Sequence, residues 1–106
     1  MPPPADGTGW KNPPVPTDLV RRRLIIHGRV QGVWFRDSLR ERARVAGVPG
    51  WARNRTDGTV EAVFEGPLEE VERLVRFCKI GPPRARVDRI QVQIESPEGL
   101  GAFEVR

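Results

Sequence analysis

The order in which hydrophobic patterns follow one another along the chain is the feature that most limits its possible folds. Short runs with the spacing of strands alternate with longer stretches that have the spacing of helices. Strands are predicted around residues 24–27, 50–54, 59–65, 87–94 and 103–105, and helices over 35–46 and 67–80. The order is therefore strand, helix, strand, strand, helix, strand, followed by one more short strand.

Both predicted helices have an apolar face and recognisable ends. In the first, Phe35, Leu39 and Ala43 recur at intervals of four residues, which places them on one side of a helix. Gly47 follows, and the end of a helix favours a residue that tolerates positive φ. The second helix is predicted to begin at Pro67, because proline suits the first helical position.

The two strands between the helices are joined by Asp57-Gly58, a strong hairpin signal. With this hairpin, the order is that of the ferredoxin-like split βαβ architecture, an α+β fold. Right-handed crossovers place both helices on one face of an antiparallel sheet of order 4-1-3-2, to which the short terminal strand is added. The first and second strands then run parallel on either side of the third. Their C-terminal ends lie at the same edge of the sheet, about 10 Å apart.

The first 20 residues do not share these patterns. Six of the chain's 11 prolines lie in its first 16 positions, where they remove backbone donors and restrict the residues that precede them. Trp10 is the one aromatic residue of this stretch. We therefore expect a disordered or weakly docked tail at 1–20 and a folded domain at 21–106.

Composition excludes several classes of protein. No apolar run approaches the roughly 20 residues of a membrane helix, and the first residues lack the pattern of a secretory signal. The single cysteine, Cys78, rules out an internal disulfide, and the single histidine, His27, rules out a histidine cluster. The expectation is a small cytoplasmic domain without a metal ion or cofactor.

The connection between the first strand and the first helix has the composition of an anion-binding loop. It reads Gly28-Arg29-Val30-Gln31-Gly32-Val33-Trp34-Phe35-Arg36. Gly28 and Gly32 permit conformations that aim successive N–H groups inward, and a helix N-terminus attracts anions. Arg36, in the first helical turn, opposes the helix dipole unless an anion binds there. From the pattern alone, a plain connection with a surface arginine is an equal alternative.

Two segments carry a family resemblance. Residues 28–36 are similar to the motif Gly-x-Val-Gln-Gly-Val-x-Phe-Arg, and residues 50–54, Gly-Trp-Ala-Arg-Asn, are similar to the segment Gly-Trp-Val-x-Asn. Both belong to the acylphosphatase family, which residues 21–106 resemble throughout. The resemblance implies hydrolysis of the mixed anhydride of a carboxylic acid and phosphate to a carboxylate and inorganic phosphate. It also implies that the reaction needs no metal ion and forms no covalent enzyme intermediate.

The resemblance further implies roles for individual residues. Arg36 corresponds to the arginine that holds the substrate phosphate, and Asn54 to the asparagine that positions the attacking water. Backbone N–H groups of the loop would surround the same phosphate, and these belong to Gln31, Gly32, Val33, Trp34, Phe35 and Arg36. Arginine suits this role because its planar group binds phosphate through two bonds. An amide can orient water but is no strong base, so the substrate phosphate is the expected proton acceptor.

Trp34 occupies a variable position of the motif. It either lines the acyl side of the pocket or covers the core.

A second interpretation is a basic domain that binds RNA or another anion without catalysis. The chain has 18 Lys plus Arg against 14 Asp plus Glu, a net charge of +4, and the run 21–23 is a solvated strand start or a basic patch. RNA-binding modules of this topology need exposed aromatic residues on the first and third strands. The third strand offers only Phe64. We therefore expect no nucleic acid partner, and no membrane partner either. The family resemblance implies a small-molecule acyl phosphate as the partner and, together with the size of the chain, a monomer.

Overall fold

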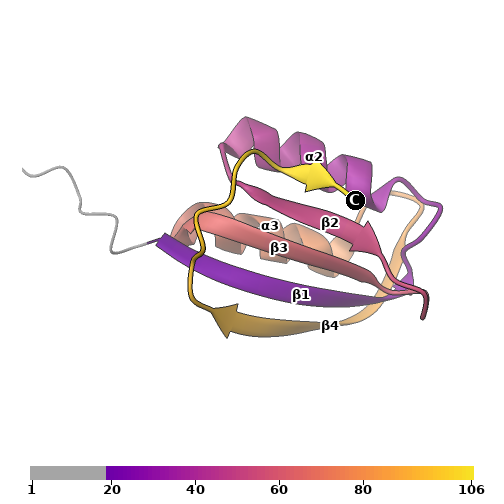
Figure 1. Ribbon diagram of the computed structural model, residues 1–106. Coiled ribbons are helices and arrows are strands. Elements are labelled where there is room, and N and C mark those ends of the chain that lie inside the picture. The colour runs from indigo at the N-terminus through magenta and orange to yellow at the C-terminus, as the bar shows by residue number, and fades with distance from the viewer. Residues whose placement is uncertain (1–18) are drawn as a thin grey trace, which may run out of the picture.

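A five-stranded sheet with two helices packed on one of its faces makes up the computed structural model, which describes residues 19–106 (Figure 1). The elements are β1 (Leu19–Arg29), α2 (Phe35–Ala46), β2 (Gly50–Asn54), β3 (Val60–Pro67), α3 (Leu68–Ile80), β4 (Arg86–Glu95) and β5 (Glu104–Val105). The strand order β4-β1-β3-β2-β5 confirms the predicted α+β architecture and its 4-1-3-2 core. β5 pairs in parallel with β2, whereas the other neighbouring strands are antiparallel.

Several element boundaries differ from the predicted ones, most of all the start of β1, whose strand is predicted only around residues 24–27. β1 begins at Leu19, two residues before the predicted start of the domain. α3 begins at Leu68 rather than at Pro67, because Pro67 has a ψ of 142° and still belongs to β3. Residues 1–18, with Trp10 and most of the predicted tail, lie outside the described residues.

The hydrophobic core lies between the sheet and the two helices. The predicted helix faces supply buried side chains, namely Phe35, Leu39 and Ala43 from α2 and Val71, Leu74 and Cys78 from α3. They pack against Leu24, Ile26, Ala62 and Phe64 of the sheet. Burial raises the pKa of the Cys78 thiol, so Cys78 stays protonated and acts as a small core residue.

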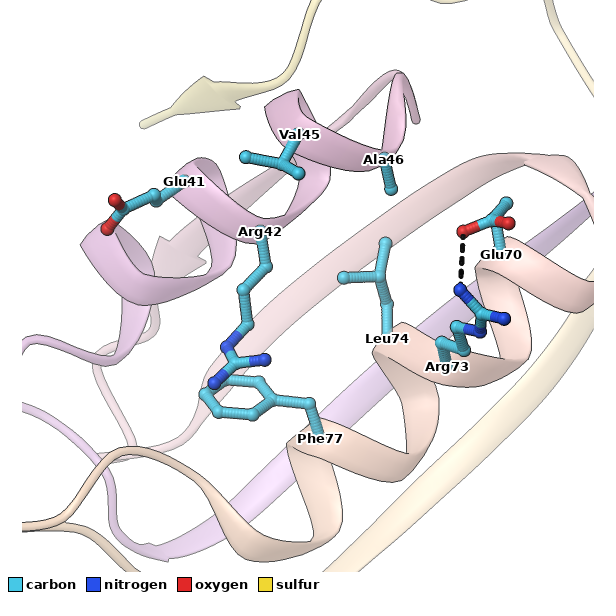
Figure 2. A pocket seen from close by; sticks show the side chains of 8 residues that line it. All are labelled: Glu41, Arg42, Val45, Ala46, Glu70, Arg73, Leu74 and Phe77. Atoms are coloured by element: carbon cyan, nitrogen blue, oxygen red, sulfur yellow. Dashed lines mark ion pairs between the residues drawn. The ribbon is translucent and has the colours of Figure 1, made fainter.

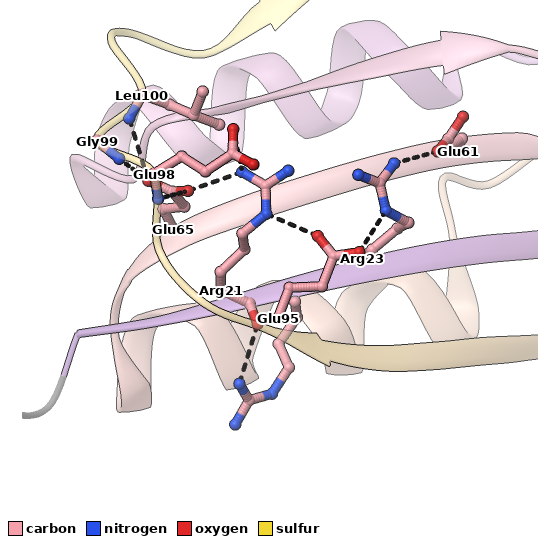
Figure 3. A network of polar contacts seen from close by, with 9 residues as sticks. Arg21, Arg23, Glu61, Glu65, Glu95, Glu98, Gly99 and Leu100 are labelled. Carbon is pink, nitrogen blue, oxygen red and sulfur yellow. Dashed lines mark hydrogen bonds and ion pairs between the residues drawn. The ribbon is translucent and has the colours of Figure 1, made fainter.

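The other face of the sheet carries a network of ion pairs (Figure 3). Arg21 donates to Glu65 and to Glu95, both at 2.7 Å. Arg23 donates to Glu95 at 2.8 Å and also to Glu61. Both interpretations of the run 21–23 are therefore wrong for Arg21, which is 3% exposed and paired on both sides. Its partners come from β3 and β4, which no local pattern could reveal.

Glu65 also fastens the segment that joins β4 to β5 across this face (Figures 1 and 3). Its carboxylate accepts hydrogen bonds from the backbone N–H groups of Glu98 at 2.7 Å, Gly99 at 3.0 Å and Leu100 at 3.1 Å. Burial raises the pKa of this carboxyl, but these bonds and the bond from Arg21 outweigh burial and lower the pKa to about 2. The segment leads directly into β5, so Glu65 helps to place β5 beside β2.

The low pKa of Glu65 makes the stability of the fold depend on pH. The folded-state pKa is about 2, below the ordinary value of 4.5, so the contribution of Glu65 is complete above pH 4.5 and is lost as the pH falls toward 2. A shift of this size corresponds to about 3 kcal/mol. We expect denaturant titrations to show a fall in the free energy of unfolding over this pH range. The variant Glu65→Gln should be less stable at pH 7 and should lose less stability on acidification.

Glu72→Gln serves as the matched control, because Glu72 is an exposed acid on α3. It should behave like the wild type at every pH. Equal pH slopes for the wild type and Glu65→Gln would contradict the role given to Glu65.

Candidate active site

The loop between β1 and α2 adopts the positive φ angles that its glycines predict. Gly28 has a φ of 132° and Gly32 a φ of 75°. A Cβ atom at Gly28 would lie 2.1 Å from the backbone oxygen of Arg86 in β4. The pairing register of β1 and β4 shifts between His27 and Gly28, and only glycine allows the two strands to pass so closely there. This passage sets the direction in which the loop leaves the sheet.

Trp34 has a conformation that the sequence did not predict. It stands just before α2 with φ 67° and ψ 24°, and it is the one non-glycine residue with positive φ within residues 19–106. A bulky side chain in this region costs on the order of 1 kcal/mol, and such costs are concentrated at functional sites. The ring is 70% exposed. Of the two predicted alternatives, covering the core is therefore wrong.

A hollow of about 170 Å³ lies between this loop and the end of β2. Its lining residues are Val30, Gly32, Trp34, Phe35, Arg36, Asp37 and Asn54. The structure thus brings Arg36 of α2 and Asn54 of β2 to one site. Figure 1 shows the reason, because the loop and the end of β2 lie at the same end of the sheet. The strand order alone predicts this meeting.

Two residues predicted for the site do not line the hollow. The Gln31 side-chain amide donates to the backbone oxygens of Arg55 at 2.7 Å and Thr59 at 3.0 Å, which ties the loop to the β2–β3 turn. Val33 is buried in the core. Phosphate binding by their backbone N–H groups stays a prediction.

The Arg36 side chain is held by a residue that sequence reasoning missed. Arg36 Nη1 donates to the backbone oxygen of Arg106 at 3.0 Å. Arg106 follows β5, and its own N–H donates to the backbone oxygen of Ala52 in β2 at 2.8 Å. The short strand at 103–105 is predicted from the sequence, but two or three residues give no signal of the strand that they pair with, so the pairing of β5 with β2 and the contact to Arg36 could not be predicted.

Asp37 is the one acidic residue in the lining of the hollow. Its carboxylate pairs with Arg40, one turn later on α2, at 3.1 Å. This pair offsets the negative charge next to Arg36 and keeps the hollow suited to an anion.

The other side chains that could take part in a reaction lie outside the hollow at Arg36. His27 contacts Gln91 at 2.9 Å, and Cys78 is in the core. Within residues 19–106, no three His, Cys, Asp or Glu side chains form a group that could hold a metal ion. In the same part of the chain, every helix is too short or too polar to cross a membrane.

A larger hollow of about 600 Å³ lies between α2 and α3 (Figure 2). Three of its four polar side chains are paired with one another or packed on a core ring, the exception being Glu41. The Arg42 guanidinium stacks on the ring of Phe77 at 4.0 Å, and Arg73 pairs with Glu70 at 3.7 Å. It contains none of the predicted site residues. This hollow is therefore a groove between packed helices, and the smaller hollow at Arg36 is the better candidate for chemistry.

Known proteins match nearly all of the part of the chain that forms this fold. The acylphosphatase family model matches residues 22–105. An acylphosphatase of Rubrobacter xylanophilus is 58% identical over 88 residues, 81% of this chain and 79% of that protein. An acylphosphatase of Haloarcula marismortui is 54% identical over 86 residues, 81% of this chain and 94% of that protein.

A solved structure agrees with the sequence comparison. The crystal structure of acylphosphatase from Bacillus subtilis aligns with a TM-score of 0.79 and 38% identity, over 82% of this chain and 98% of that chain. The family match includes the loop, Arg36 and Asn54, and the fold that presents them is the same. The chain belongs to the acylphosphatase family.

Proposed function

We propose that this protein hydrolyses acyl phosphates to a carboxylate and inorganic phosphate, by direct attack of water and without a metal ion or cofactor. One observation carries the proposal: Arg36 and Asn54, from two different elements, line the same small hollow at the end of the sheet. The family membership of the chain and the names of its relatives support the same activity. The protein acts on a small molecule and is a cytoplasmic monomer. Its domain comprises the predicted residues 21–106 and also Leu19 and Val20, with which β1 begins.

Arg36 and the loop bind the phosphate group in this proposal. A guanidinium group is planar and permanently charged, and it can donate two parallel bonds to phosphate oxygens. The bond to the backbone oxygen of Arg106 uses one of its five donors and fixes the plane of the group. The backbone N–H groups of residues 31–36, at the N-terminus of α2, supply further donors to the anion.

Asn54 positions the attacking water. Its amide can accept a hydrogen bond from the water and donate one to the phosphate at the same time. The water oxygen forms a bond to phosphorus while the bond from phosphorus to the acyl oxygen breaks. The carboxylate leaves with that electron pair, and a proton of the water passes to a phosphate oxygen. Positioning and charge stabilisation are the main contributions a protein makes to this kind of transfer, so no stronger base is required.

Binding of RNA has less support. Phe64, the one aromatic residue on the third strand of the fold, is fully buried against the helices and cannot stack on a base. On the opposite face of the sheet, Arg21 and Arg23 of β1 are already paired with glutamates. We therefore favour the acyl phosphate as the partner.

Hydrolysis of benzoyl phosphate in the presence of excess EDTA tests the proposal. We expect turnover well above spontaneous hydrolysis, at a rate that EDTA does not change. Absence of turnover by the folded protein would overturn the proposed activity. Loss of turnover in EDTA that added metal restores would overturn the metal-free mechanism.

A further inference from the structure

The hollow at Arg36, called the first hollow below, has a neighbour at Asn54. This neighbour, called the second hollow, has a volume of about 510 Å³. Its lining residues are Arg23, Trp51, Arg53, Asn54, Glu61 and Arg106. Successive residues of a strand point to opposite faces, and Ala52 is in the core, so Trp51 and Arg53 lie on the face away from the helices. Asn54 is part of both linings. A molecule with its phosphate in the first hollow could therefore extend past Asn54 into the second.

Three guanidinium groups surround Trp51 in this second hollow. The guanidinium carbons lie 4.7 Å (Arg106), 5.6 Å (Arg23) and 5.8 Å (Arg53) from the ring centre. Glu61 is the one carboxylate of the lining and pairs with both Arg23 and Arg53. The lining thus has more positive than negative groups, and Glu61 holds two of the arginines in place.

Arg53 and Arg106 can still accept an anion. Arg53 donates to Glu61 at 2.7 Å through one edge of its guanidinium, and its side chain is still 53% exposed. The side chain of Arg106 is 48% exposed. Arg106 has a partner in Glu104 at 3.4 Å, but an exposed pair of this kind contributes little. A carboxylate placed between the two guanidinium groups would form charge-assisted bonds with both.

Arg106 connects the second hollow with the phosphate site. Its backbone oxygen accepts from Arg36, while its guanidinium stacks on Trp51. One residue therefore contacts the proposed phosphate-binding side chain and lines the neighbouring hollow. This arrangement suits a single small molecule that carries an anionic group at each end.

We propose that the second hollow binds the acyl group of the substrate and favours acyl groups that carry a carboxylate, which Arg53 and Arg106 bind. This inference rests on the proposed hydrolysis of acyl phosphates. It makes the two arginines determinants of specificity, whereas Arg36 and Asn54 act at the phosphate.

Succinyl phosphate and butyryl phosphate provide the test, because they have the same number of carbon atoms and differ by a terminal carboxylate in place of a methyl group. We expect the wild type to show a kcat/KM about tenfold or more higher for succinyl phosphate, with the difference mainly in KM. Arg53→Gln and Arg106→Gln should each remove most of this preference. The readout is the ratio of kcat/KM for succinyl phosphate to kcat/KM for butyryl phosphate in each variant, because a general loss of activity lowers both values and leaves the ratio unchanged.

Arg73→Gln is the matched control, because it removes the same charge from α3 at the distant groove and should leave the preference unchanged. A wild type that hydrolyses both substrates equally well, or variants that keep the full preference, would overturn the inference but not the activity. A wild type that hydrolyses neither substrate would overturn the proposed function itself.

Discussion

Replacing Arg36 by alanine is expected to lower kcat/KM for benzoyl phosphate by at least about 10²-fold, the usual loss when a main electrostatic donor is removed from a site. Arg36 lines the hollow between the loop and β2, and its plane is fixed by the backbone oxygen of Arg106. Lysine keeps the charge but not the two parallel donors. Arg36→Lys should therefore recover only a small part of the lost activity.

Steady-state kinetics and inhibition by inorganic phosphate measure this effect. The inhibition constant for phosphate should rise along with the loss of activity, because the same side chain binds both. Arg44→Ala, an exposed arginine in the last turn of the same helix, should behave like the wild type. Activity of Arg36→Ala within tenfold of the wild type would remove Arg36 from the mechanism.

Replacing Asn54 by alanine is also expected to lower the rate by at least about 10²-fold, but through kcat rather than through binding of phosphate. Its amide lies at the end of β2, where the proposed water would stand between it and the phosphate. The inhibition constant for inorganic phosphate should change by no more than a few fold. This difference separates the two roles.

Asn54→Asp adds a carboxylate that cannot donate to the phosphate and repels it, so this variant should be inactive and should also bind phosphate weakly. Thr56→Ala, in the exposed turn after β2, provides the control. A strong loss of phosphate binding in Asn54→Ala, with kcat unchanged, would show that Asn54 binds the anion instead of positioning water.

Much of the fold could be predicted because local signals mark the ends of its elements. Gly47 ends α2 with a φ of 70°, and Asp57-Gly58 turns the chain between β2 and β3. Handedness of the crossovers then fixes the strand order, and the strand order brings Arg36 and Asn54 to the same end of the sheet. These steps require only contacts between residues that are near in sequence and general rules of packing.

The parts that could not be predicted depend on distant partners. Arg21 looks like a surface residue in the sequence, yet Glu65 and Glu95 bury it. The contact between Arg36 and Arg106 depends on β5, a strand of two residues that is held in place by its pairing with β2. The unusual backbone of Trp34 is likewise imposed by its surroundings, because its residue type disfavours positive φ.

Glu65 holds the β4–β5 segment across the sheet, and the support of Arg36 by Arg106 depends on the position of that segment. The contact between Arg36 and Arg106 joins residues 70 positions apart, and contacts of such long range are entropically costly until the intervening chain is ordered. The hairpin of β2 and β3 can form locally, but Arg36 gains its support only after the last segment has crossed the sheet. A chain whose last segment is detached from the sheet would keep the loop but lack this support for Arg36, so we expect the proposed activity to be complete only when β5 is in place.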